Sequence, residues 1–204
     1  FNGYESVDEA ISQCTQVVNT LQPVKWISIG GNGNPYGKIT ADVLSSTASS
    51  ADTFIKAGYA GVIFDAEVVE GTNDALVSGF SSASKTLVGK GLQVGVTTSH
   101  SGPFEVTGGA DAATLVKGWV ADPNMAVLAP QLYTSGEETS PDFLTTSSCS
   151  ACTWDIWKGS AGAFAPSIVE ASQYDATSTY FKDNFGITTQ GYICLLYTSP
   201  SPRD

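Results

Sequence analysis

The sequence predicts an α/β fold built on a parallel β-sheet. Along the 204-residue chain, six short apolar segments rich in β-branched residues alternate with longer segments of helical periodicity. Polar residues follow several of the apolar segments at their carboxyl ends. In a (β/α)8 barrel such residues meet at the mouth, so this arrangement favours a barrel over an open, doubly wound sheet. The length suffices for one domain with a sizeable core.

Five helices are expected from their periodicity and their end signals. The first begins at a capping box formed by Ser6 and Glu9. Glycines close the second, third and fifth helices, and Pro123 stops the fourth. The expected helical ranges are 6–21, 40–57, 73–88, 110–120 and 177–185.

Six strands are expected between these helices and after the last of them. A long polar loop with a short helical piece separates the fourth strand from the fifth, and it carries Cys149 and Cys152. One Cys-x-x-Cys supplies only half of a zinc site, and His100 is far away in sequence, so we expect no metal. A small local disulfide or two idle thiols remain the alternatives. The expected strand ranges are 24–31, 58–67, 92–99, 125–133, 161–168 and 187–193.

The second of these strands carries two acids at its tip. Alternation along a strand places Gly61, Ile63, Asp65 and Glu67 on one face. Two carboxyls on one face repel each other, which couples their protonation and shifts at least one pKa. Acid–base catalysis requires such a shift. The alternative is an ordinary strand end that meets solvent, where Asp and Glu are common.

Composition argues against several functional classes. The formal net charge is −11, with nine Lys and Arg residues and no basic run, which disfavours nucleic acid as a partner. No apolar run is long enough to span a bilayer, so no membrane partner is expected. The glycine-rich stretch from Gly30 to Pro35 lacks the Lys-Ser/Thr of a phosphate loop, which disfavours nucleotide binding. No cofactor is expected. Richness in Ser, Thr and Gly with few Lys fits a secreted protein.

The last residues differ in character from the rest. From Cys194 to Asp204 the chain resembles a translated sequencing-library adaptor. We therefore expect the domain to cover residues 1–193 and residues 194–204 to be a cloning or assembly scar.

Five motifs follow one another along the chain: Ser28-Ile-Gly-Gly31, Ala60-Gly-Val-Ile-Phe-Asp-Ala-Glu67, Gln131-Leu-Tyr133, Trp154-Asp-Ile-Trp157 and Gly191-Tyr-Ile193. In this order they resemble motifs of glycoside hydrolase family 18, especially the plant-type class III chitinases. The first is similar to the family's Ser-x-Gly-Gly strand, and the second to its Asp-Gly-x-Asp-x-Asp-x-Glu strand. The third resembles Gln-Phe-Tyr, the fourth Trp-x-x-Trp, and the fifth the start of the last strand.

The resemblance implies a (β/α)8 TIM barrel, truncated at its N-terminus, in which the six expected strands are the third to the eighth. It implies that Glu67 is the general acid, that Asp65 orients and stabilises the substrate's acetamido group, and that Tyr133 hydrogen-bonds the acetamide. Core packing is the alternative for Tyr133, and for Trp154 as well. The residues implied to line the substrate site are Gln131, Ser28, Gly30, Gly31 and Trp154.

The function implied is hydrolysis of β-1,4-linked N-acetylglucosamine polymers such as chitin. In this family the substrate's acetamide acts as nucleophile, so one acid and one orienting carboxylate suffice. The chain departs from the motif at Ala60 and Ile63, where the family has acids. A catalytically weak or inactive carbohydrate-binding protein is therefore the alternative, and a different glycan substrate is a third hypothesis. We expect a secreted monomer whose partner is an N-acetylglucosamine-containing glycan.

Overall fold

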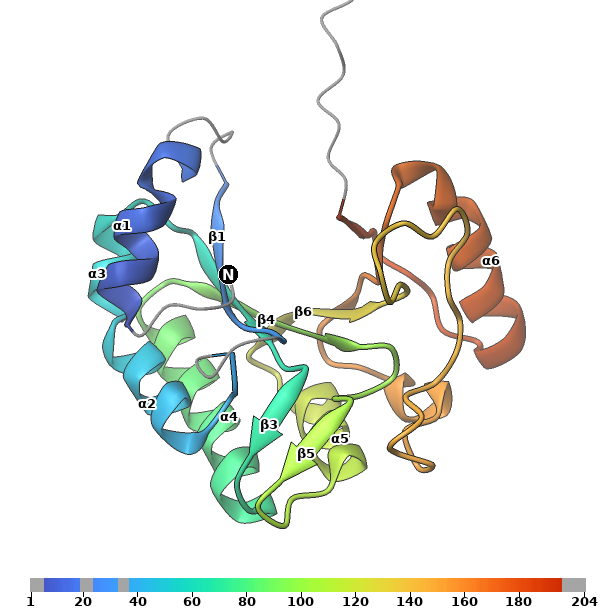
Figure 1. Ribbon diagram of the computed structural model, residues 1–204, viewed down its shortest axis with the longest axis horizontal. Coiled ribbons are helices and arrows are strands. Elements are labelled where there is room, and N and C mark those ends of the chain that lie inside the picture. Colours follow the sequence, from blue (N-terminus) through green and yellow to red (C-terminus); the bar gives the residue numbers. More distant parts are fainter. Residues whose placement is uncertain (1–5, 19–23, 33–36, 196–204) are drawn as a thin grey trace, which may run out of the picture.

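The main feature of the computed structural model, which describes residues 6–18, 24–32 and 37–195, is a curled parallel β-sheet. The strands are β1 (Trp26–Gly30), β2 (Gly61–Asp65), β3 (Val68–Glu70), β4 (Gln93–Ser99), β5 (Glu105–Thr107), β6 (Met125–Gln131), β7 (Ala163–Phe164), β8 (Ser167–Ile168) and β9 (Ile193–Cys194). The main sheet has the order β1-β2-β4-β6-β8-β9, and β7 also pairs with β6. Because β1 and β9 lie apart at its two ends, the sheet forms a half-barrel (Figure 1). The expected α/β class with a parallel sheet is confirmed.

Helices cover the convex side of this sheet (Figure 1). They are α1 (Val7–Val18), α2 (Ala41–Ser49), α3 (Ala51–Lys56), α4 (Asn73–Gly89), α5 (Ala112–Ala121) and α6 (Tyr174–Phe185), with two short 3-10 helices, η1 (Trp154–Trp157) and η2 (Ala171–Gln173). The expected capping box is borne out in part, since the Glu9 amide donates to Ser6 Oγ at 3.1 Å. Gly186 ends α6 in the left-handed conformation, as its position predicted. The expected end of the first helix, at Leu21, lies outside the described residues.

The two faces of the sheet differ in what they contact. Ile27, Val62 and Val94 are in register on neighbouring strands and have no exposed surface, because they pack against the helices. The next row, which includes Ile63 and Val127, faces the concave side. There it lines an apolar pocket of about 340 Å³ together with Trp26. The interior of the half-barrel is therefore mostly apolar below the strand ends.

The single helix expected over 40–57 is two helices in the structure. Ser50 is the C-cap of α2 and the N-cap of α3. The hydroxyls of Thr47, Ser49 and Ser50 donate to the carbonyls four residues earlier, at 2.7, 2.9 and 2.9 Å. Such side-chain bonds compete with the helical ladder and bend it, which explains the break.

The last two expected strands are much shorter in the structure. The expected strand 161–168 is divided into β7 and β8 at Pro166, which has no amide to give to the ladder. Only two residues remain in β8 for pairing, so β9 is limited to Ile193 and Cys194. The expectation of a strand from 187 to 192 was wrong. The main-chain pairing also continues into Leu195, whose amide donates to Ile168 O at 2.8 Å.

A second small sheet was not expected. It consists of β3 and β5, which pair in parallel beside the carboxyl ends of the main strands (Figure 1). Each has only three residues, too few to show a period in the sequence. Within the described residues, no helix combines the length and the apolar character needed to cross a membrane.

Candidate active site

Asp65 ends β2 and Glu67 follows it at the carboxyl edge of the sheet. The backbone of β1 approaches this edge closely, because the Gly31 amide donates to Asp65 O at 2.7 Å. A Cβ atom at Gly30 would lie 2.4 Å from the same oxygen, and Gly30 has a φ of 111°. Only glycine fits there. Gly30 and Gly31 therefore act on Asp65 through the backbone.

Gln131 joins the two carboxyls. Its Nε2 lies 3.2 Å from Asp65 Oδ1 and 3.2 Å from Glu67 Oε1, and an amide nitrogen carries one hydrogen for each. Gln131 is buried at the end of β6, where register aligns it with Ser99 of β4 and Ser167 of β8. The amide thus fixes the distance between two acids that would otherwise repel each other.

The environment raises the pKa of Asp65 to about 7. Burial is the main cause, and the negative charge of Glu67 is the second. A hydrogen bond to Glu67, which Asp65 can donate only when it is protonated, raises the pKa further. Ile63 lies on the same strand face one step further into the apolar interior. The carboxyl pair therefore holds a proton up to near-neutral pH, as the spacing of the two acids predicted.

Tyr133 lies just beyond the end of β6 and is brought to the same group. Its hydroxyl lies 3.2 Å from Ser167 Oγ. Burial raises the pKa of Tyr133 to about 12, and the carboxylates of Asp65, Glu67 and Glu138 act in the same direction. Tyr133 is therefore a neutral O–H donor at physiological pH.

The loop after Tyr133 is ordered by Glu138. Its carboxylate accepts hydrogen bonds from the amides of Thr134 and Ser135, both at 2.7 Å, and from the amide of Gly136 at 2.8 Å. Partial burial acts to raise the pKa of Glu138, but these bonds outweigh it and lower the pKa to about 2. Glu138 therefore remains ionised and holds the loop next to Tyr133.

Other residues expected at the site lie elsewhere. Ser28 is in register with Ile63, one layer below Asp65. Trp154 is only 1% exposed, donates from Nε1 to Phe143 O at 2.9 Å and packs edge-on against Phe181. It belongs to the core and is not brought to the carboxyl pair.

Two contributors to the site and one further polar contact were missed by reasoning from the sequence. Ser167 is the second-last residue of the expected strand 161–168, so the rule that polar residues near strand ends mark the site could have found it. No pattern in the neighbouring sequence distinguishes Glu138 from an ordinary acidic residue in a loop. His100, noted in the sequence only as far from the two cysteines, has Nε2 3.2 Å from Asp142 Oδ2. This contact joins residues 42 positions apart and is invisible to local patterns.

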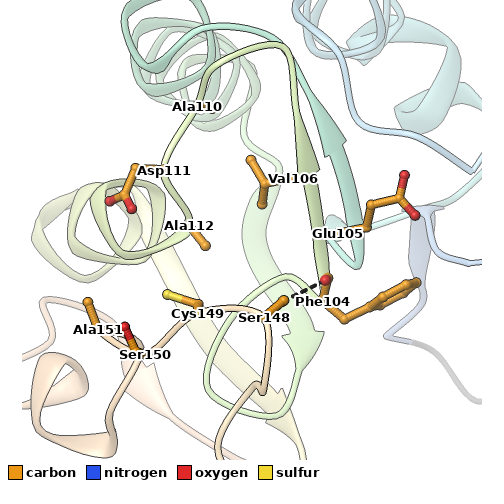
Figure 2. Close-up of a pocket in the computed structure, with 10 residues that line it drawn as sticks. All are labelled: Phe104, Glu105, Val106, Ala110, Asp111, Ala112, Ser148, Cys149, Ser150 and Ala151. Atoms are coloured by element: carbon orange, nitrogen blue, oxygen red, sulfur yellow. Dashed lines mark hydrogen bonds between the residues drawn. The ribbon is translucent and has the colours of Figure 1, made fainter.

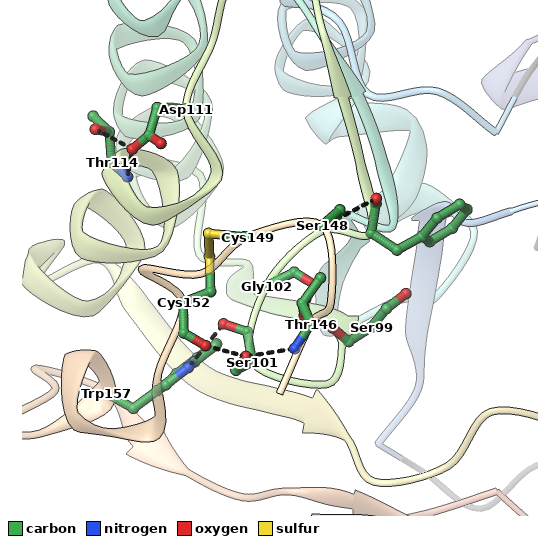
Figure 3. Close-up of a disulfide and its surroundings, with 11 residues drawn as sticks. Ser99, Ser101, Gly102, Asp111, Thr114, Thr146, Ser148, Cys149, Cys152 and Trp157 are labelled. Carbon is green, nitrogen blue, oxygen red and sulfur yellow. Dashed lines mark hydrogen bonds between the residues drawn. A yellow bond between two sulfur atoms is a disulfide. The ribbon is translucent and has the colours of Figure 1, made fainter. Parts of the chain in front are cut away.

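The backbone of Glu67 is held by the loop after β4. The amides of Phe104 and Glu105 both donate to Glu67 O, at 3.1 and 3.3 Å. This loop is fastened in turn to the segment carrying Cys149 and Cys152, which form a disulfide (Figure 3). The local disulfide is therefore the correct alternative of the two that the sequence left open.

Ser101 makes several of the hydrogen bonds that join this loop to the disulfide segment. It is fully buried, and its hydroxyl donates to Cys152 O and accepts from the Thr146 amide at 3.0 Å (Figure 3). Its carbonyl accepts from Trp157 Nε1 at 3.2 Å. The disulfide segment thus supports the loop that supports Glu67.

We expect the double substitution Cys149→Ser/Cys152→Ser to lower the free energy of unfolding by about 2 kcal/mol. A short closed loop restricts the unfolded chain, and opening it releases that restriction. Urea unfolding measures the loss, and Cys194→Ser, outside the disulfide, is the control. An equal change in both variants would contradict a role specific to the disulfide.

A surface depression of about 390 Å³ lies beside the disulfide (Figure 2). Its two acidic side chains are Glu105 and Asp111, and Asp111 Oδ1 accepts from the amide and the hydroxyl of Thr114 at the start of α5. Neither Asp65 nor Glu67 lines it. We assign no chemistry to this depression.

In the described part of the chain, no cluster of three or more His, Cys, Asp or Glu side chains is arranged to hold a metal ion. No family model, no curated protein and no solved structure matches the chain. The chemistry of the strand ends is therefore the ground for a functional proposal.

Proposed function

We propose that the chain is a glycoside hydrolase that cleaves β-1,4-linked N-acetylglucosamine polymers with retention of configuration. The observation that carries the proposal is the carboxyl pair of Asp65 and Glu67, bridged by Gln131 at the carboxyl edge of a curled parallel sheet. This edge is where α/β barrels build their active sites. The pair retains a proton near neutral pH, and general acid catalysis consumes one.

In the proposed reaction, the proton that Asp65 holds passes to Glu67, which leaves Asp65 ionised. Glu67 then gives this proton to the glycosidic oxygen as the bond from that oxygen to the anomeric carbon breaks. The carbonyl oxygen of the substrate's acetamide forms a bond to the same carbon, which yields a cyclic oxazolinium ion. Glu67, now a carboxylate, takes a proton from water as the water opens the ring. Two inversions at one carbon give net retention.

The neighbouring groups act on the acetamide. As the oxazolinium forms, Asp65 faces a developing positive charge, which an ionised carboxylate stabilises. Tyr133, which stays protonated, donates a hydrogen bond that orients the acetamide. Gln131 holds both acids in place while the proton moves. Each group acts without a metal or a cofactor.

We also infer that β1, β2, β4, β6, β7 with β8, and β9 correspond to the third to eighth strands of a (β/α)8 barrel. The order of the motifs supports this assignment, as do the edges at β1 and β9, which pair with no further strand of the described residues. Gly30 and Gly31 would then border the substrate site from its third strand, whereas Ser28 lies one layer below it. The disulfide fits an oxidising, extracellular location.

A carbohydrate-binding protein without strong activity is the second candidate. It is favoured by one specific feature, the apolar Ile63 below Asp65 where the resembled family has an acid. Loss of that acid removes a charged partner from Asp65 without removing the binding surface.

The test is incubation of the chain with a β-1,4-linked N-acetylglucosamine hexamer, with products followed by proton NMR from the first minutes. We expect the β-anomer to appear first and to equilibrate later with the α-anomer. The matched control is the fully deacetylated hexamer, which lacks the internal nucleophile and should resist cleavage. An initial α-anomer, or efficient cleavage of the control, overturns the mechanism, whereas binding without turnover selects the second candidate.

A further inference from the structure

Ser167 occupies a fixed position beside the proposed catalytic group. Its carbonyl accepts from the Leu132 amide at 2.8 Å, and it is in register with Gln131 of β6 and Ile193 of β9. The residue is 3% exposed. Strands on both sides thus restrain its backbone, and little room remains for its side chain to move.

The Ser167 hydroxyl faces Tyr133. The two oxygen atoms are 3.2 Å apart, so one of the hydroxyls donates to the other. A phenol has a single hydrogen. If Tyr133 donated it to Ser167, that hydrogen would be lost to the substrate. If Ser167 donates, the hydrogen of Tyr133 is left for another acceptor.

The charges around Tyr133 favour the second arrangement. Asp65, Glu67 and Glu138 act on the Tyr133 hydroxyl with negative potential. A hydroxyl hydrogen is drawn toward such a potential. We propose that Ser167 is a positioning residue that donates to Tyr133 Oη and thereby directs the Tyr133 hydrogen toward the bound acetamide. This inference rests on the proposed function. It assigns a role to Ser167, which lies outside the five motifs that suggested that function.

The segments that follow Tyr133 and Ser167 along the chain are joined by Gln173. Gln173, which is 4% exposed, donates from Nε2 to Glu138 O at 2.8 Å, in the loop after β6. Its Oε1 accepts from the Val169 amide at 3.1 Å, in the segment after β8. This link keeps the ends of β6 and β8 together, so the distance between Tyr133 and Ser167 is maintained.

The experiment compares Ser167→Ala, Ser167→Thr, Tyr133→Phe and the double variant Ser167→Ala/Tyr133→Phe in hydrolysis of the N-acetylglucosamine hexamer. We expect Ser167→Ala to lower kcat by about 3- to 10-fold with little change in KM, the loss of one hydrogen bond. Ser167→Thr keeps the hydroxyl but adds a methyl group at a buried position, so it should retain more activity than Ser167→Ala. In the Tyr133→Phe background, Ser167→Ala should have no further effect.

The matched control is Ser99→Ala, since Ser99 borders Gln131 on the opposite side, in register with it. An equal loss from Ser167→Ala in both backgrounds, or a loss in Ser99→Ala of the same size, overturns the proposal. So does full activity of Ser167→Ala.

A second measurement needs no turnover and separates failure of this inference from failure of the proposed function. With tyrosines labelled at 13Cζ, the Tyr133 resonance, identified by its absence in Tyr133→Phe, should shift in Ser167→Ala. It should stay in place in Ser99→Ala. An unmoved resonance overturns the proposal whether or not the hexamer is cleaved.

Discussion

Replacing Glu67 with glutamine is expected to lower kcat for the N-acetylglucosamine hexamer by about 10²- to 10⁴-fold, the range typical of general acid catalysis. Glutamine has nearly the same shape, but its amide cannot give a proton to the glycosidic oxygen. It can still contact Gln131, through its carbonyl oxygen, so the pocket should keep its form. Steady-state kinetics measure the loss, and calorimetric titration measures hexamer binding, which should survive.

Glu70→Gln is the matched control for this variant. Glu70 lies three residues further along the chain, in β3, and its carboxylate pairs at 2.6 Å with Lys38. The same chemical change there should leave kcat within about twofold, since exposed ion pairs contribute little. Retention of more than about a tenth of the activity in Glu67→Gln would assign the proton donor to another group.

Replacing Asp65 with asparagine is expected to lower kcat and, at the same time, to remove a pH-dependent loss of stability. The pKa of Asp65 is about 7 in the folded chain, against 3.8 for an ordinary Asp side chain. A raised pKa favours the folded state while the carboxyl is protonated. That stabilisation is complete below about pH 4 and is lost as the pH rises through about 7.

The size of this effect is on the order of 4 kcal/mol, since each pKa unit corresponds to about 1.4 kcal/mol. Ionisation of Asp65 should therefore lower the free energy of unfolding of the wild type at pH 8 relative to pH 4. Urea unfolding at the two pH values measures this difference. The Asp65→Asn variant should lack this component, because its amide does not titrate. Asp183→Asn, at an exposed position of α6, is the control and should preserve it.

An identical difference between pH 4 and pH 8 in the wild type and in Asp65→Asn would contradict the environment described for Asp65. The effect of Asp65→Asn on kcat is measured separately. Asparagine retains hydrogen bonding but cannot stabilise the oxazolinium charge, so kcat should fall while the hexamer still binds.

Much of the fold follows from local signals in the sequence. The alternation of apolar segments and helical periods determined the parallel α/β class, and Gly186 determined where α6 ends. The placement of Asp65 and Glu67 at a strand tip follows from the two-residue period of a strand. These features depend on residues close together in the chain, so the sequence contains them directly.

Other features depend on which distant segments become neighbours. A strand forms only where a neighbouring strand can pair with it. Because β8 has only two residues, residues 187–192 have no partner in it and are not a strand. The hydrogen bonds of the serine hydroxyls at the end of α2 join residues close in sequence. The break that they cause was nevertheless missed, because the apolar periodicity continues through it.

The sequence by itself determined that two acids share one face of a strand. Only the tertiary structure decided that Gln131, more than sixty residues away, bridges them and that Ser167 contacts Tyr133. The pKa of Asp65 is likewise a tertiary property, because its largest cause is burial. Desolvation and hydrogen bonding act through space, over distances of a few ångströms, whatever the separation along the chain.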